Sequence, residues 1–221
     1  MKKRLKFSGS ILILFAGAFQ LHPILTTTSS LKENELKGYI ASKNTRIIKE
    51  EESELAKTIL QESKKLEIPA HLKIDGKPIN KAAFLTALIQ TESVFKRKAV
   101  SYKNAKGYMQ LMPTTYKWIK NKSGKKHDEN AIFLAKENIP SGVEYLNLLM
   151  NEFQDLRLVC LAYNAGPGAV KRGILIESYY RKIVTIYREI QNQENGKMEE
   201  KSLALNTEGN AYQATLFRLS R

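Results

Sequence analysis

Apolar residues recur three and four positions apart in several stretches of the chain, which is the spacing of one face of a helix. The stretch KAAFLTALIQTES has the strongest pattern. Its apolar face consists of Phe84, Leu85, Leu88 and Ile89. Asn80, a residue type that favours the helix N-cap, stands just before this stretch, and we expect the helix to end near Ser93 or Val94.

Similar patterns predict helices on both sides of this one. Residues 31–66 are polar and rich in helix-forming residues, with an apolar stripe that includes Leu55 and Ile59. Further helices are expected after Pro113 in TTYKWIK, from about Asn138 in NIPSGVEYLNLLMNEF, and later in SYYRKIVTIYREI. The apolar run DLRLVCLAYNAG ends in a Gly-Pro-Gly sequence, which stops a helix. Because strand-like alternation is scarce, we expect a mainly α fold with long loops and little or no β structure.

The polarity of the chain also suggests its domain boundaries. Residues 1–30 begin with basic residues, continue with a short apolar run and end in small and polar residues, as a secretory signal peptide does. The apolar run is shorter than the roughly 20 residues that span a bilayer, although the segment could be kept as an N-terminal anchor. Residues 31–66 form a helical lead-in segment, 67–190 the main domain and 191–221 a polar tail. We expect an exported protein of the periplasm or cell envelope, with membrane contact only through its N-terminal segment.

The net charge of +14 at pH 7 is concentrated in one segment. Between Lys96 and Lys126 the chain has ten Lys or Arg residues and no Asp or Glu. Such a segment attracts polyanions such as acidic wall polymers, although a solvated basic loop explains the charge equally well. Nucleic acid is not expected as a partner, because the sequence has neither a recognition helix nor an RNA-binding motif.

Glu92 lies on the apolar face of the helix, three residues after Ile89 and four after Leu88. A Glu in the last turn of a helix commonly just reaches solvent. If the carboxyl instead packs among Leu and Ile side chains, burial raises its pKa, and the group can hold and donate a proton near neutral pH. The spacing alone is compatible with both interpretations.

Several short motifs accompany Glu92 in a fixed order. They are Glu92-Ser93, Ser101, GYMQLMP from Gly107 to Pro113, NIPSGVEYL from Asn138 to Leu146, AYNAG from Ala162 to Gly166, and ESYYRKI from Glu177 to Ile183. Together they resemble the soluble lytic transglycosylase family, whose catalytic domain is a lysozyme-like helical fold. The resemblance spans roughly residues 80–190, and the conserved order of the blocks makes it more specific than any single block.

The resemblance implies an enzyme that cleaves the β-1,4 bond between N-acetylmuramic acid and N-acetylglucosamine in peptidoglycan glycan strands, without water and without a cofactor. Glu92 would be the catalytic residue: it would protonate the glycosidic oxygen and then act as base towards the muramoyl 6-hydroxyl, closing a 1,6-anhydro ring. No other acidic residue occurs between Glu92 and Asp128, which suits a mechanism in which the substrate's acetamido group replaces a second carboxylate.

The same resemblance implies substrate-binding roles for a further set of residues. They are Ser101, Gln110, Met112, Tyr163, Asn164 and Tyr179. Ser101 would orient the acetamido group, and Gln110 and Met112 would line the sugar subsites. Tyr163 would place its hydroxyl beside the catalytic carboxyl, and Asn164 would hold sugar or backbone. Each also has an ordinary structural explanation, such as core packing for Tyr163 or a loop hydrogen bond for Gln110.

Two departures from the family pattern lie in the loop before Gln110. Tyr108 stands where the family commonly has Leu, and Tyr102 to Ala105 stand where it has Pro-x-Gly-Ala. We expect both to affect sugar specificity more than the chemistry.

Two alternatives to a lytic transglycosylase remain open at this point. One is a hydrolytic lysozyme of related fold, and the other is a non-catalytic module that binds the cell wall. A metal site is not expected, because His22, His71 and His127 are scattered and have no cysteine partner.

Overall fold

The computed structural model describes residues 32–126, 128–193 and 196. The expected signal peptide or anchor, residues 1–30, lies outside the described residues, as does most of the expected polar tail, residues 191–221. Within the described ranges, no helix is long and apolar enough to cross a membrane.

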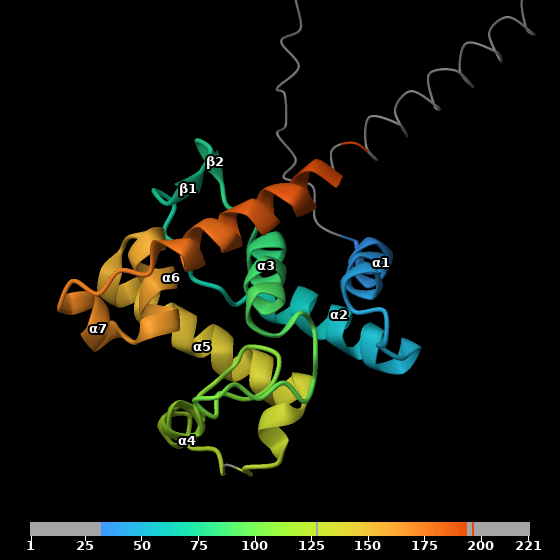
Figure 1. Ribbon diagram of the computed structural model, residues 1–221, viewed down its shortest axis with the longest axis horizontal. Coiled ribbons are helices and arrows are strands. Elements are labelled where there is room, and N and C mark those ends of the chain that lie inside the picture. The colour runs from blue at the N-terminus through green and yellow to red at the C-terminus, as the bar shows by residue number, and fades with distance from the viewer. Residues whose placement is uncertain (1–31, 127, 194–195, 197–221) are drawn as a thin grey trace, which may run out of the picture.

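This part of the chain forms a helical domain with a short hairpin (Figure 1). The helices are α1 (Glu33–Lys43), α2 (Lys49–Ser63), α3 (Lys81–Ser93), α4 (Pro113–Lys122), α5 (Ala135–Phe153), α6 (Leu156–Ala165), α7 (Pro167–Lys171) and a helix over residues 177–193. β1 (Lys73–Ile74) and β2 (Lys77–Pro78) pair antiparallel, and a 3-10 turn, η1 (Ala131–Phe133), precedes α5. The mainly α fold class predicted from the sequence is confirmed.

Helix α3 lies in the middle of the domain (Figure 1). Its apolar residues from Ala83 to Ile89 are all 0% exposed, so the helix is buried all round and not only on the one face that the sequence pattern suggested. The side chain of Asn80 accepts hydrogen bonds from the N–H groups of Ala82 and Ala83, which confirms the predicted N-cap.

The helix over residues 177–193 crosses α3 (Figure 1). Near its end, the hydroxyl of Tyr187 accepts a hydrogen bond from the N–H of Asn80, at 3.1 Å. Near its start, the hydroxyl of Tyr179 donates to the carboxylate of Glu92. The two contacts hold this helix against both ends of α3.

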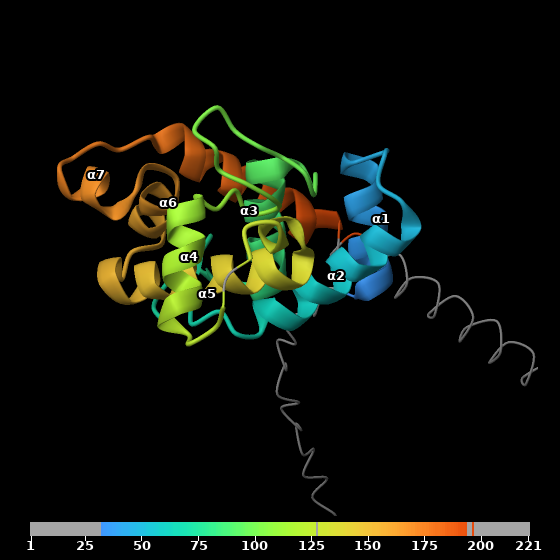
Figure 2. The ribbon, with the colours of Figure 1, turned by 90° about the horizontal axis from the view of Figure 1, so that it is seen from below.

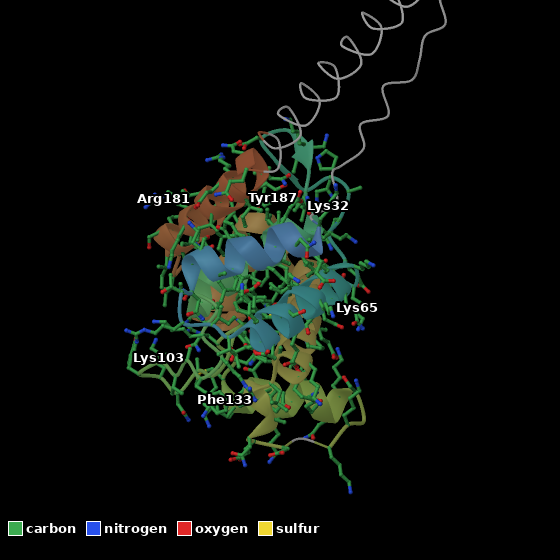
Figure 3. All side chains as sticks on the ribbon, turned by 90° about the vertical axis from the view of Figure 1, so that its right-hand side faces the viewer. Lys32, Lys65, Lys103, Phe133, Arg181 and Tyr187 are labelled. Atoms are coloured by element: carbon green, nitrogen blue, oxygen red, sulfur yellow. The ribbon has the colours of Figure 1, made fainter. Side chains whose placement is uncertain are left out.

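Helices α1 and α2 pack side by side on one flank of the domain (Figure 3). Leu36, Ile40, Leu55 and Ile59 are fully buried and belong to the same apolar core as α3. The polar lead-in segment therefore shares its hydrophobic core with the helix that carries Glu92.

Helix α5 begins at Ala135, earlier than the expected start near Asn138. The amphipathic pattern becomes clear only from about Asn138, so it did not indicate the first turn of the helix. In the structure Pro140 lies inside the helix, so α5 loses one backbone hydrogen bond and still continues. Burial of Ile139 and Val143 on either side of the proline offsets that loss.

Candidate active site

The chain reverses direction directly after Glu92. Val94 ends α3 with a left-handed φ of 51°, and Phe95 follows at 59°. A left-handed conformation costs a non-glycine residue about 1–2 kcal/mol. Phe95 is completely buried, and the burial of its ring offsets part of that cost. The reversal leaves Glu92 at the partly exposed end of an otherwise buried helix.

The carboxyl of Glu92 has an unusual environment. Burial raises its pKa from 4.5 to about 7, while the hydrogen bond from Tyr179 and the positive charge of Lys182 lower that pKa. The ammonium of Lys182 donates to the carbonyl of Thr91 at 3.3 Å, so it lies near Glu92 and binds the backbone beside it. Of the two interpretations that the sequence left open, the raised pKa favours a carboxyl that can hold and donate a proton near neutral pH.

The position of Tyr163 differs from the expectation. Its hydroxyl donates to the carbonyl of Met109 at 2.8 Å, whereas the hydroxyl that donates to Glu92 is that of Tyr179. The negative charge of Glu92 contributes to raising the pKa of Tyr163, after burial, so the two side chains are still close. Tyr163 therefore connects α6 to the loop before α4, and Tyr179 makes the direct contact with the carboxyl.

Gln110 is also used differently from the expectation. It has a left-handed φ of 47°, and its side-chain N–H₂ donates to the carbonyls of Ala99 and Gly107, at 3.1 and 2.9 Å. These two bonds link separate parts of the loop to each other. They correspond to the ordinary structural explanation for Gln110, a hydrogen bond within the loop. The Oε1 atom of Gln110 is the part of the amide that remains for a ligand.

The other expected binding residues lie on the surface around the loop. Ser101 Oγ accepts a hydrogen bond from the N–H of Ala105 at 3.0 Å, which leaves its hydroxyl proton for another acceptor. Met112 is 39% exposed at the start of α4, and Asn164 is exposed near the end of α6. All three side chains are accessible to a ligand.

The motif NIPSGVEYL, in α5, binds the loop that precedes α4, and this role could not be read from the sequence. Asn138 is completely buried; its Oδ1 accepts from the N–H of Met109 at 2.7 Å, and its Nδ2 donates to the carbonyls of Lys106 and Ile132. At Gly142, a Cβ would lie 2.3 Å from the sulfur of Met109. A larger residue at this position would therefore have to displace the buried side chain of Met109.

Helices α1 and α2 brace the same region from the other side. Tyr39 donates its hydroxyl to the Gln90 side chain at 2.7 Å, and Asn44 donates to the carbonyl of Phe95 at 2.9 Å. Both acceptors lie within three residues of Glu92. We call this pair of contacts the α1 brace. These contacts could not be predicted from the sequence, because their partners are 51 residues apart and leave no periodic signal.

A further contact joins α2 to the loop through one of the family departures. The hydroxyl of Tyr108 donates to Glu51 Oε1 at 2.7 Å, and the ring is only 1% exposed. The Leu that is common in the family has no hydroxyl for such a bond. The tyrosine at position 108, where the family commonly has Leu, was therefore the feature of the sequence that could have indicated a contact between the loop and the lead-in segment.

Within the described part of the chain, no group of three or more His, Cys, Asp or Glu side chains is arranged to hold a metal ion. Cys160 is completely buried, and burial raises the pKa of its thiol well above the ordinary value. A buried thiol that stays protonated is a poor nucleophile. The titratable side chains that the structure brings together in this region are Glu92, Tyr179 and Tyr163.

Comparison with known proteins identifies similar sequences and folds. Residues 72–183 match the family model described as the transglycosylase SLT domain. A membrane-bound lytic murein transglycosylase C of Mannheimia succiniciproducens is 37% identical over 103 residues, which cover 41% of this chain and 28% of that protein. The Haemophilus influenzae (strain PittEE) protein of the same name is 36% identical over 101 residues, with the same coverage. The chain thus spans little more than a quarter of the length of these relatives.

Among solved structures, an inactive mutant of the lytic transglycosylase Slt from Pseudomonas aeruginosa aligns with a TM-score of 0.46 and 24% identity, covering 72% of this chain and 26% of that one. The 70 kDa soluble lytic transglycosylase of Escherichia coli aligns with a TM-score of 0.46 and 18% identity, covering 76% of this chain and 29% of that one.

Proposed function

Because the chain belongs to the transglycosylase SLT domain family, whose model matches residues 72–183, we propose that it is a peptidoglycan lytic transglycosylase. Its substrate is the glycan strand, and the bond cleaved is the β-1,4 bond from N-acetylmuramic acid to N-acetylglucosamine. The observation that carries the proposal is the placement of Glu92, partly exposed in the last turn of the otherwise buried helix α3 and hydrogen-bonded by Tyr179; burial raises the pKa of its carboxyl to about 7, in agreement with this role.

In the first step, protonated Glu92 gives its proton to the glycosidic oxygen. The C–O bond to the anomeric carbon of the muramoyl residue breaks, and the N-acetylglucosamine part leaves with a free hydroxyl. Tyr179 keeps its own proton in this step, because burial, first, and the nearby Glu92 charge both raise its pKa well above the ordinary value. Its hydroxyl stabilises the carboxylate that forms when Glu92 loses the proton.

The positive charge that develops at the anomeric carbon needs a stabilising partner. Among the described residues, the groups that shift the pKa of Glu92 electrostatically are Tyr179 and Lys182, and neither is a carboxylate. We therefore assign the stabilising role to the acetamido oxygen of the muramoyl residue itself, as in substrate-assisted glycosidases. Ser101, whose hydroxyl proton is not used in its bond to Ala105, would orient that acetamido group.

In the second step, the Glu92 carboxylate takes the proton from the 6-hydroxyl of the same muramoyl residue. The freed oxygen attacks the anomeric carbon and closes the 1,6-anhydro ring. The carboxyl is protonated again, so the cycle needs no water and leaves the enzyme unchanged. Met112 and Asn164 offer exposed apolar and polar surface for the flanking sugars, together with Oε1 of Gln110.

The basic segment from Lys96 to Lys126 is consistent with a second contact to the wall. Lys120 is buried and pairs with Glu137 at 2.5 Å, so it is not available to a partner. The exposed lysines of the segment, of which Lys103 projects from the loop in Figure 3, would attract acidic wall polymers. This partner, and an envelope or periplasmic location, belong to the proposal.

The deciding experiment digests purified sacculi and weighs the released muropeptides by mass spectrometry. The proposal expects anhydro products, one water lighter than hydrolysed ones. Products with a reducing end would identify a lysozyme instead. Release of no fragments by the folded protein, together with tight binding to sacculi, would identify a non-catalytic wall-binding module.

A further inference from the structure

Helices α4 and α5, which cross in Figure 2, line an open pocket that the proposed reaction does not use. Its volume of about 350 Å³ lies near the lower end of the range for small-molecule sites, about 300–1,000 Å³. Helix α4 contributes Thr115 and Trp118 to the walls, and α5 contributes Tyr145, Leu149 and Glu152. Because these α5 residues lie on one helical face, the pocket is a trough that runs about 10 Å along α5.

Trp118 is the feature of this pocket that most needs explanation. It is the only tryptophan in the chain, and it is 50% exposed. Its ring and that of Tyr145 line the same trough from two helices. A pyranose presents C–H groups on its face and hydroxyls at its edge, so aromatic faces can cover the C–H groups while threonine and carboxylate oxygens meet the hydroxyls.

The charge of the lining favours a neutral ligand. None of the lining residues is cationic, and the carboxylate of Glu152 pairs with Lys171 at 2.5 Å. Two cations border the lining and each has a partner within the domain: Lys171 pairs with Glu152, and the ammonium of Lys122 lies 5.8 Å from the centroid of the Trp118 ring. The N-acetylhexosamine units of a glycan strand are neutral and fit this lining.

Tyr145 links the trough to the candidate active site through its contact with Tyr163. The ring of Tyr145 lies 5.5 Å from that of Tyr163, centroid to centroid, and the hydroxyl of Tyr163 binds Met109 of the loop. The exposed Met112 immediately precedes α4, whose first two turns carry Thr115 and Trp118. A glycan strand that lies across Met112 would therefore enter the trough beside Tyr145.

We propose that this trough is a distal sugar subsite, in which Trp118 and Tyr145 bind an N-acetylhexosamine unit of the same glycan strand that is cleaved at Glu92. The inference rests on the proposed function for the identity of the strand. What it adds is a second binding place for the substrate, at Trp118 of α4, which lies outside the family motifs.

The only tryptophan of the chain lies in the proposed subsite and reports on it directly. In the full chain carrying Glu92→Gln, which binds without cleaving, chitin oligosaccharide should shift the fluorescence of Trp118 and the shift should saturate. Adding Tyr145→Ala should weaken binding about tenfold, which corresponds to about 1.4 kcal/mol. Adding Asn151→Ala, at an exposed position of α5 outside the trough, should leave the titration unchanged.

With sacculi as substrate and an active Glu92, Trp118→Ala should raise KM about tenfold with little change in kcat, and Trp118→Tyr should restore most of the affinity. Equal unfolding midpoints for these variants and the wild type would exclude a folding defect. The inference is overturned if the fluorescence of Trp118 does not respond to oligosaccharide, or responds only to fragments that carry stem peptides. If Trp118 responds and wild-type enzyme releases no anhydro product, the proposed function fails and the sugar subsite stands.

Discussion

Helices α2 and α3 both carry carboxylates that pack against the core, but the carboxylates of the two helices have different hydrogen-bond partners. Glu52 and Glu62 of α2 are each only 4% exposed and pair with Lys49 and Lys65, at 3.1 and 2.7 Å. Glu92 of α3 is more exposed than either, and its hydrogen-bond partner is the neutral hydroxyl of Tyr179. A lysine partner favours the ionised carboxylate, whereas a desolvated site with a neutral donor leaves the proton on the carboxyl more readily.

Glu52 and Glu62, which pair with lysines, therefore differ from Glu92, the proposed acid, in the partner that each carboxyl has. Exposure alone would have ranked the three residues in the wrong order, since the candidate acid is the least buried of them. The identity of the partner group, and the apolar surroundings of the carboxyl itself, distinguish Glu92.

The sharpest test of this distinction replaces each carboxyl with an amide. Glu92→Gln should lower the rate of fragment release from sacculi by about a thousandfold, the middle of the range for loss of a general acid and base. Glu62→Gln should keep the catalytic rate, because its carboxylate pairs with Lys65 and is not part of the proposed site. Similar losses of rate in the two folded variants would contradict the distinction.

The pH dependence of stability should differ between the same two variants. The folded state holds the Glu92 proton more tightly than the unfolded chain, with pKa values of about 7 and 4.5. This contribution to stability is fully present below pH 4.5 and is lost as pH rises through about 7, to a total of about 3 kcal/mol.

Urea unfolding at several pH values measures the effect. Glu92→Gln should remove this downward slope and be more stable than the wild type near pH 8, whereas Glu62→Gln should keep the slope. A wild-type stability that rises across the same interval, with the same curve for Glu92→Gln, would show that Glu92 titrates like a free side chain.

Removing the neutral donor should change the pKa of Glu92 in a defined direction. The Tyr179 hydroxyl stabilises the ionised carboxylate and lowers its pKa, so Tyr179→Phe should raise that pKa further. The pH at which activity falls on the alkaline side should therefore move upward, with a loss of rate of about tenfold from the lost hydrogen bond. Lys182→Met should move the alkaline limb in the same direction by less, since the charge of Lys182 is the smaller influence. A downward shift in either variant would contradict this.

The smallest expected effect concerns the contact between α2 and the loop. Tyr108→Phe removes the hydrogen bond to Glu51 and should cost about 1 kcal/mol of unfolding free energy. Tyr116→Phe is the matched control, because the buried hydroxyl of Tyr116 has no hydrogen-bond partner among the described residues and its removal should cost less. Thermal unfolding of both variants measures the difference, and equal costs would show that the Glu51 contact contributes nothing.

Much of the local structure could be predicted from the sequence. The apolar spacing in KAAFLTALIQTES, the cap at Asn80 and the end at Ser93 match α3, and Pro113 marks the start of α4. These features depend on residues within one or two turns of each other, so the sequence contains all the information that determines them. The position of Glu92 at the end of an apolar helix was visible for the same reason.

The partners of the candidate acid could not be predicted in this way. Tyr163 and Tyr179 are both tyrosines of family motifs, and only the crossing of helix 177–193 over α3 decided that Tyr179 reaches Glu92, 87 residues away. The same is true of the α1 brace and of the trough beside Trp118, whose walls come from separate helices. Hydrogen bonds and pockets between distant segments depend on how whole helices pack, and no spacing within one segment encodes that packing.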